Sequence, residues 1–165
     1  MNPQLELLAF AAVRNLAAAG LTVTTAESCT GGLIAAAITG VPGASAVLRY
    51  GWVTYCNEAK ERLLGVDPEL IRQHTVVSEP VVAAMAEGAL AQSGADIAIA
   101  VSGNAGPDAA PGEPPVGTVC IAILRRGAAA PPHTETIFRQ GMPRNDFRVM
   151  VAARVLELII AAASR

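Results

Sequence analysis

Apolar residues recur along this chain at two different spacings, and the alternation of the two predicts its secondary structure. Between residues 5 and 19 they stand three or four apart, the period of a helix, and Gly20 follows as the residue that ends it. Short runs rich in Val, Ile and Thr indicate strands instead. Further helices are expected over 31–39, from a cap at Asn57 to Gly65, from a cap at Ser78 to about Ser93 and over 144–163, and strands over 21–25, 47–50, 52–56, 96–101, 116–124 and 134–138.

Strands that alternate with helices are typical of a layered α/β domain. The run from Ile97 to Val101 is apolar without a break, which suits a strand covered on both faces. The segment 106–115 is rich in Pro, Gly and Ala, and we expect a loop there, since chain remains on both sides to complete the sheet. No repeat or linker divides the 165 residues, so the sequence predicts a single domain over 1–165.

The amino-acid composition excludes several functional classes. Hydrophobic residues make up 52% of the chain, charged residues 16%, and the formal net charge is −2. This balance argues against a disordered chain and offers no basic surface for nucleic acid or an anionic membrane. The uncharged stretch between Glu27 and Arg49 is long enough to span a bilayer, but Gly40, Pro42 and Gly43 interrupt it. We therefore expect a buried helix and a turn there, and neither a nucleic-acid nor a membrane partner.

The three cysteines favour a reducing compartment. Cys29, Cys56 and Cys120 are widely separated, odd in number and without a CxxC pair, which fits neither a disulfide framework nor a structural zinc site. The N-terminus also lacks the basic start of a signal peptide. A cytoplasmic protein is the expectation.

Small polar residues follow the first predicted strand, over 24–32. In open α/β sheets, ligands bind beyond the carboxyl ends of strands. Backbone N–H groups at the start of the next helix can hold a phosphate or the oxyanion of a transition state. The alternative is that Ser28 or Thr30 simply caps that helix. Cys29 is a candidate nucleophile, but the chain has only two histidines that could activate it.

The residues after a later strand, over 101–107, are small as well. Glycines there let a ligand approach the backbone closely. An ordinary glycine-rich turn explains the same pattern, so this segment is a second candidate wall of a binding site.

Lys60 is the only lysine in the chain, and the other 11 basic residues are arginines. Lysine can lose its proton when it is desolvated, whereas arginine cannot, so Lys60 is a candidate general base. It stands early on the helix that starts at Asn57, where the helix dipole favours the neutral amine. The hydroxyl of Tyr55 could relay a proton or fix Lys60 if both face one cleft. The alternative is a solvated lysine on a charged helix.

Arg144 and Arg148 are one helical turn apart on the last predicted helix and share a face. Two guanidinium groups on one face near a helix start suit a phosphate or a carboxylate. A plain solvated helix face is the competing interpretation.

Five segments, taken in this order, resemble a known family: Thr25-Ala-Glu-Ser-Cys-Thr-Gly-Gly32, Gly51-Trp-Val-Thr-Tyr-Cys-Asn-Glu-Ala-Lys60, Val77-Ser-Glu-Pro80, Ser102-Gly-Asn-Ala-Gly-Pro107 and Pro115-Val-Gly-Thr-Val119. They are similar to the CinA C-terminal domain family, whose characterised members are nicotinamide-nucleotide amidases. The resemblance extends from about Leu5 to the end of the chain. Larger members carry an additional N-terminal domain, so the chain resembles the stand-alone amidase form.

The resemblance implies a three-layer α/β/α sandwich with a parallel or mixed sheet, a homodimer, and neither a metal nor an organic cofactor. It implies hydrolysis of nicotinamide mononucleotide to nicotinate mononucleotide and ammonia, in pyridine nucleotide recycling. Ser28, Lys60 and Tyr55 take the positions of the family's catalytic serine, lysine and tyrosine. The residues expected to bind the substrate are Glu27, Cys29, Thr30, Gly31, Gly32, Gly103, Asn104, Ala105, Gly106, Arg144 and Arg148.

The loop after the second strand end departs from the family pattern. Ala109-Ala110 stands where members have a glycine pair, Pro114 where they have a lysine, and Asn104 where they have a small apolar residue. These changes affect a candidate ligand contact. Two alternatives to the amidase therefore stay open: a non-catalytic nucleotide-binding module, and an amidase for a different amide.

Overall fold

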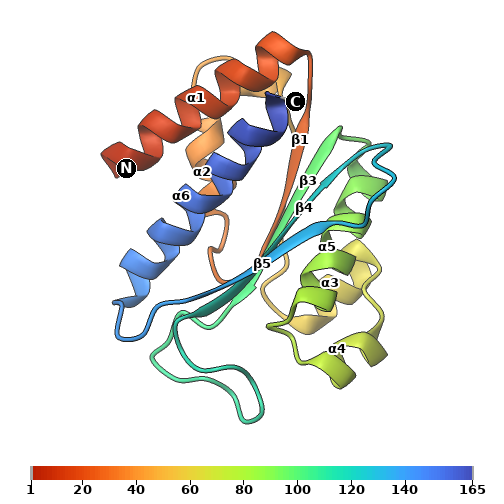
Figure 1. The fold of residues 1–165 in the computed structure, drawn as a ribbon, viewed down its shortest axis with the longest axis vertical. Coiled ribbons are helices and arrows are strands. Elements are labelled where there is room, and N and C mark those ends of the chain that lie inside the picture. Colours follow the sequence, from red (N-terminus) through yellow and green to blue (C-terminus); the bar gives the residue numbers. More distant parts are fainter. Residues whose placement is uncertain (1, 165) are drawn as a thin grey trace.

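The computed structural model describes residues 2–164 and places a five-stranded sheet between two layers of helices (Figure 1). In chain order the elements are α1 (Pro3–Ala19), β1 (Val23–Glu27), α2 (Leu33–Thr39), the 3₁₀ helix η1 (Ala44–Ala46), β2 (Leu48–Val53), α3 (Asn57–Leu64), α4 (Pro68–His74), α5 (Glu79–Ser93), β3 (Ile97–Gly103), β4 (Thr118–Arg125), β5 (His133–Phe138) and α6 (Arg144–Ala163). The strand order is β2-β1-β3-β4-β5.

The sheet is mixed. β1 runs parallel to β2 and to β3, whereas β4 is antiparallel to β3 and to β5. Helices α1, α2 and α6 cover one face, and α3, α4 and α5 cover the other (Figure 1). The predicted three-layer α/β/α sandwich is confirmed. Within residues 2–164, no helix combines the length and the apolar character needed to cross a bilayer.

The two faces of the sheet carry side chains of different size. Ile97 and Ile99 of β3 pack with α1, α2 and α6, whereas Ala98 and Ala100 pack with α5 on the other face. Successive side chains of a strand point to opposite faces, so one strand contributes to both layers of the core. This is why β3 is apolar without a break, and the small alanines leave room for α5 against the sheet.

One strand, β2, replaces the two strands that were expected over 47–50 and 52–56, so that prediction is wrong. Gly51 lies in the middle of this strand and does not form a turn between two strands. A Cβ on Gly51 would lie 3.0 Å from the Ala35 Cβ, so its absence lets α2 pack closely on β2. The chain leaves the sheet after Val53 and enters the segment that leads to α3.

Two predicted helix starts also differ. The helix expected from residue 31 begins at Leu33, because Gly31 and Gly32 have positive φ angles of 59° and 91°. The N-cap of α3 is Cys56, and Asn57 is the first residue of the helix rather than its cap.

Helix α4 and the 3₁₀ helix η1 were not predicted from the sequence. Helix α4 does carry a start signal, because the Asp67 side chain accepts a hydrogen bond from Glu69 N and Pro68 follows Asp67 directly. At seven residues it is too short to show a clear helical period. The strand expected over 21–25 is shifted to Val23–Glu27.

The carboxyl ends of β1, β2 and β3 lie at one edge of the sheet because the three strands are parallel neighbours. In the sheet register, Glu27 at the end of β1 is paired with Val53 on one side and Val101 on the other. The β1–α2 connection, the β2–α3 connection and the long loop after β3 therefore start from the same edge, as expected for a ligand site in such a sheet.

Candidate active site

Ser28 is the first residue after β1, and it extends the line of that strand. Its backbone N–H donates to the carbonyl of Val101 on β3 at 3.1 Å. This bond holds residue 28 at the sheet edge, and its side chain is only 8% exposed. The hydroxyl therefore has a fixed position beside the neighbouring strands.

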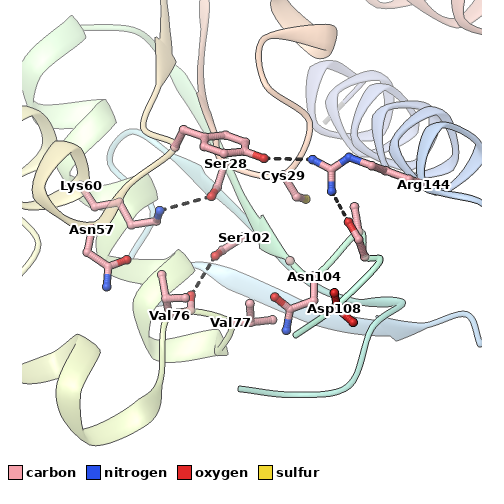
Figure 2. Close-up of a pocket in the computed structure, with 14 residues that line it drawn as sticks. Ser28, Cys29, Asn57, Lys60, Val76, Val77, Ser102, Asn104, Asp108 and Arg144 are labelled. Atoms are coloured by element: carbon pink, nitrogen blue, oxygen red, sulfur yellow. Dashed lines mark hydrogen bonds between the residues drawn. The ribbon is translucent and has the colours of Figure 1, made fainter. Parts of the chain in front are cut away.

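Lys60 approaches Ser28 from α3. Its Nζ lies 3.2 Å from Ser28 Oγ and donates to the Thr54 carbonyl at 2.8 Å (Figure 2). The Lys60 side chain is 1% exposed. Burial lowers the pKa of Lys60, because water no longer stabilises the ammonium form. Nearby Cys56, Cys29 and Glu113 raise that pKa in part. The geometry and the lowered pKa suit a general base for the serine.

Tyr55 lies at the exposed rim of the site, and its side chain is 59% exposed. Its hydroxyl accepts a hydrogen bond from Arg144 Nη2 at 2.9 Å. The other terminal nitrogen of Arg144 donates to the Gly106 carbonyl. The expected hydrogen bond that fixes Lys60 to Tyr55 is therefore absent among the described residues. Thr54 holds Lys60 instead, through a backbone carbonyl that lies deeper in the site.

These side chains surround a cavity of about 230 Å³ (Figure 2). Nine of the residues predicted for the site line it: Ser28, Cys29, Tyr55, Lys60, Gly103, Asn104, Ala105, Gly106 and Arg144. They come from the ends of β1 and β3, from the β2–α3 segment, from α3 and from the start of α6. Segments far apart in the sequence thus meet in one pocket.

The other five predicted residues do not line this cavity: Glu27, Thr30, Gly31, Gly32 and Arg148. The buried Glu27 carboxylate accepts hydrogen bonds from the backbone N–H groups of Ile34 at 3.1 Å and Ala35 at 2.8 Å. It therefore caps α2, in place of Ser28 or Thr30, the two caps that the sequence suggests. A carboxylate already occupies this helix start, so a phosphate is not expected there.

Arg148 contacts the backbone of the β1–α2 turn. Its Nη2 donates to the Thr30 carbonyl at 2.8 Å, and its Nη1 donates to Asn145 Oδ1 at 3.3 Å. Arg144 and Arg148 share a helix face as predicted, but only Arg144 reaches the cavity. The two arginines consequently do not form the joint anion clamp that their spacing suggested.

The thiol of Cys29 is buried next to the serine. Burial raises the pKa of Cys29 to about 12, so it is protonated and a poor nucleophile near neutral pH. Among residues 2–164, no backbone carbonyl accepts a hydrogen bond from the N–H groups of Cys29 and Thr30, although the Cys29 N–H contacts its own thiol. They belong to the two residues after Ser28, so they are candidates to donate to an oxyanion at this turn.

Five residues that line the cavity were not among the predicted ones: Asn57, Val76, Val77, Ser102 and Asp108. Val77 and Ser102 begin two of the segments that carry the family resemblance, and that position could have identified them as site residues. Asn57 was interpreted as a helix cap. Val76 had no local signal, because only the return of the α4–α5 connection to the sheet edge brings it there. Within residues 2–164, no three His, Cys, Asp or Glu side chains gather as metal ligands would.

The profile of the CinA C-terminal domain family matches residues 6–163. The chain belongs to this family. Among curated relatives, a CinA-like protein of Akkermansia muciniphila is 51% identical over 152 residues, which are 92% of this chain and 36% of the relative. The nicotinamide-nucleotide amidohydrolase PncC of Escherichia coli K12 is 56% identical over 108 residues, 66% of each chain. The matched part spans only 24–36% of the length of the CinA-like relatives.

Solved structures show the same CinA domain architecture. The competence/damage inducible protein CihA of Agrobacterium tumefaciens has a TM-score of 0.93 at 38% identity, and the match covers 100% of this chain and 98% of that one. A CinA superfamily protein of Escherichia coli has a TM-score of 0.89 at 31% identity and covers 98% and 92%. The match to the family profile and to these structures extends over residues 6–163.

Proposed function

We propose that this CinA domain is an amidase that hydrolyses the carboxamide of nicotinamide mononucleotide, with Ser28 as nucleophile and Lys60 as general base. One observation carries the proposal: a buried amine with a lowered pKa lies 3.2 Å from a buried serine hydroxyl in the wall of a pocket. The relative PncC, named a nicotinamide-nucleotide amidohydrolase, supports the choice of substrate.

In the first half of the reaction, neutral Lys60 takes the proton of the Ser28 hydroxyl. Oγ then bonds to the carboxamide carbon, and the carbonyl oxygen becomes an oxyanion. The N–H groups of Cys29 and Thr30, from which no backbone carbonyl accepts, are our candidates to stabilise it. The Lys60 ammonium returns its proton to the leaving nitrogen as the C–N bond breaks, which releases ammonia and leaves an ester on Ser28.

In the second half, the neutral amine of Lys60 removes a proton from water, which attacks the ester carbon. The C–O bond to Ser28 then breaks, and Lys60 returns the proton to Oγ. The net reaction consumes one water and yields one carboxylic acid and one ammonia. One amine can serve in both halves of the reaction because Thr54 O and Ser28 Oγ hold it from two sides.

The charges in the pocket suit a nucleotide that carries both a cationic pyridinium ring and an anionic phosphate. Arg144 presents a guanidinium at the rim, and Asp108 presents a carboxylate in the same cavity. We assign Arg144 to the phosphate and Asp108 to the cationic part of the substrate. Arg148 and the start of α2 are left out of this assignment because they do not line the cavity.

The test is ammonia release from nicotinamide mononucleotide by purified protein, measured for the wild type, Ser28→Ala and the exposed-site control Ser45→Ala. We expect release by the wild type and the control, and a loss of about 10³-fold or more in Ser28→Ala. Full activity in Ser28→Ala would contradict the mechanism.

A different amide substrate is the second candidate, and one contact favours it. Asn104 and Pro114, which both depart from the family pattern, are joined by a hydrogen bond of 2.6 Å from Asn104 Nδ2 to the Pro114 carbonyl. Asn104 also lines the cavity, so the change reaches the ligand. Ammonia from another amide, but none from this nucleotide, would select this alternative. A rise in melting temperature with the nucleotide, but no turnover of any amide, would indicate a binding module.

A further inference from the structure

One wall of the pocket is a short irregular segment, Val76–Val77, between α4 and α5. Thr75, just before it, has a positive φ of 64°, which is unusual for a residue other than glycine. The segment lies outside any helix or strand, so its backbone groups need partners from elsewhere. Figure 2 shows Val76 and Val77 across the pocket from Arg144.

A single carboxylate supplies most of these partners. Glu113 Oε1 accepts from Val76 N at 3.0 Å, and Glu113 Oε2 accepts from Val77 N at 3.1 Å. From the sheet side, Ser102 Oγ donates to the Val76 carbonyl at 2.8 Å. Two consecutive N–H groups held by one carboxylate form a rigid fork, and such charge-assisted bonds are stronger than neutral ones.

Glu113 comes from the loop that connects β3 to β4, and this loop is itself anchored at its base. Asn104 N donates to Thr118 O at 2.8 Å, and Gly117 N donates to Asn104 O at 2.7 Å. The carboxylate therefore connects two separate walls of the pocket, one after β3 and one before α5. It also lies close enough to raise the pKa of buried Lys60 in part.

We propose that Glu113 is a positioning residue of this site, which fixes the Val76–Val77 wall and adds a negative charge to the surroundings of Lys60. Its kinetic consequences rest on the proposed amidase function. Removing the fork lets the wall move, so the substrate binds less tightly. Removing the charge takes away one influence that favours the ammonium form of Lys60.

Three variants separate hydrogen bonding from charge. Glu113→Asp keeps the charge, but its shorter arm cannot reach both N–H groups. Glu113→Gln keeps the length and one carbonyl acceptor, but it removes the charge. Glu87→Gln is the matched control. Glu87 is exposed on α5, so this substitution removes the same charge at a position away from the pocket.

The first measurement needs no substrate. Lys60 is the only lysine, so lysine labelled with ¹³C at Cε reports its titration by NMR as a single side-chain signal. We expect a lower pKa of Lys60 in Glu113→Gln than in the wild type, and no such shift in Glu87→Gln. Hydrogen exchange of the Val76 and Val77 amides should become about tenfold faster or more in both Glu113 variants.

The second measurement is the pH profile of amide hydrolysis. In Glu113→Gln, KM should rise about tenfold and the acid limb of kcat should move to lower pH. In Glu113→Asp, KM should rise while the acid limb stays in place. An unchanged Lys60 titration or unchanged exchange of the two amides in Glu113→Gln overturns the inference. A wild type that hydrolyses no amide overturns the proposed function instead, and the NMR and exchange results still decide the role of Glu113.

Discussion

Gly88 on α5 lies directly against the carbonyl group of Leu64, the last residue of α3. A Cβ built on Gly88 would stand 1.8 Å from the Leu64 oxygen. Helix α5 packs on the sheet, and α3 packs on α5, so this contact brings α3 toward the sheet edge. Lys60 is on α3, and its Nζ lies 3.2 Å from Ser28 Oγ.

Gly88→Ala should therefore destabilise the protein by about 2 kcal/mol or more, because the added methyl overpacks the α3–α5 contact. In an open helix the same change stabilises by about 0.5–1 kcal/mol, so the sign of the effect tests the contact. Urea unfolding measures the change. Ala91→Gly, at an exposed position of α5, is the control for helix propensity and should cost about 1 kcal/mol. A stabilised Gly88→Ala protein would contradict the packing.

Lys60→Met should abolish ammonia release, with a loss of about 10³-fold or more, because no base then activates the Ser28 hydroxyl. Lys60→Arg should be equally inactive, since a guanidinium does not give up its proton. The control is Arg62→Met, which removes a cation from the exposed side of the same helix. Substantial activity in Lys60→Arg would show that another group is the base.

The buried amine should also make stability depend on pH. The pKa of Lys60 is lowered from 10.5 in the folded chain, so the unfolded chain binds the additional proton between the folded pKa and about 10.5. Stability attributable to this group therefore rises with pH through that window and is lowest below it. The raised pKa of Cys29 acts in the opposite direction above pH 9.

The difference between wild type and Lys60→Met isolates the lysine, since both proteins carry Cys29. Urea unfolding from neutral pH to about pH 10.5 should show the wild type gaining stability relative to the variant. A difference that stays constant over this range would mean that the pKa of Lys60 is not lowered.

Thiol reagents should discriminate between the three cysteines. Cys56 is exposed, whereas Cys29 and Cys120 are buried, and burial raises the pKa of both buried thiols. Iodoacetamide should add one group to the native wild-type protein, at Cys56. The Cys56→Ser variant should not be labelled at a comparable rate. Mass spectrometry of the intact protein and its peptides measures the adducts. Rapid labelling of Cys29 would contradict its inert environment.

Tyr55→Phe tests what the tyrosine hydroxyl does. It is bonded to Arg144, away from Lys60, so its loss should loosen the rim of the pocket and raise KM by about tenfold. The value of kcat should change much less. Tyr50→Phe, exposed on β2, is the matched control. A fall in kcat of about 10²-fold or more, without a rise in KM, would instead assign a proton-transfer role to Tyr55.

The order of helices and strands could be predicted from the sequence because hydrophobic residues repeat locally with the period of each element. The helical spacing of 5–19 and the unbroken apolar run of β3 both reflect which faces become buried. Errors arose where a residue has two possible uses. Gly51 suggested a break between two strands, but in the structure it makes room for Ala35 within one strand.

Ser28 and Lys60 could be singled out from the sequence, because the lone lysine and the motif around the serine are visible there. Their contact could not, since 32 positions separate them. The role of Glu27 could not be predicted either, because its position in the motif suggested a ligand contact. In the structure its carboxylate caps α2, because the turn at Gly31 and Gly32 directs the helix start back toward it.

The sequence by itself thus determined the alternation of helices and strands, the family and the candidate pair Ser28 and Lys60. Only the tertiary structure decided which predicted residues share a cavity, which partner Tyr55 has, and that Glu113 holds Val76–Val77. The physical reason is that periodicity and turn chemistry are local. Contacts across the sheet edge, and the burial that lowers the pKa of Lys60, exist only after parallel strands and two helix layers have assembled.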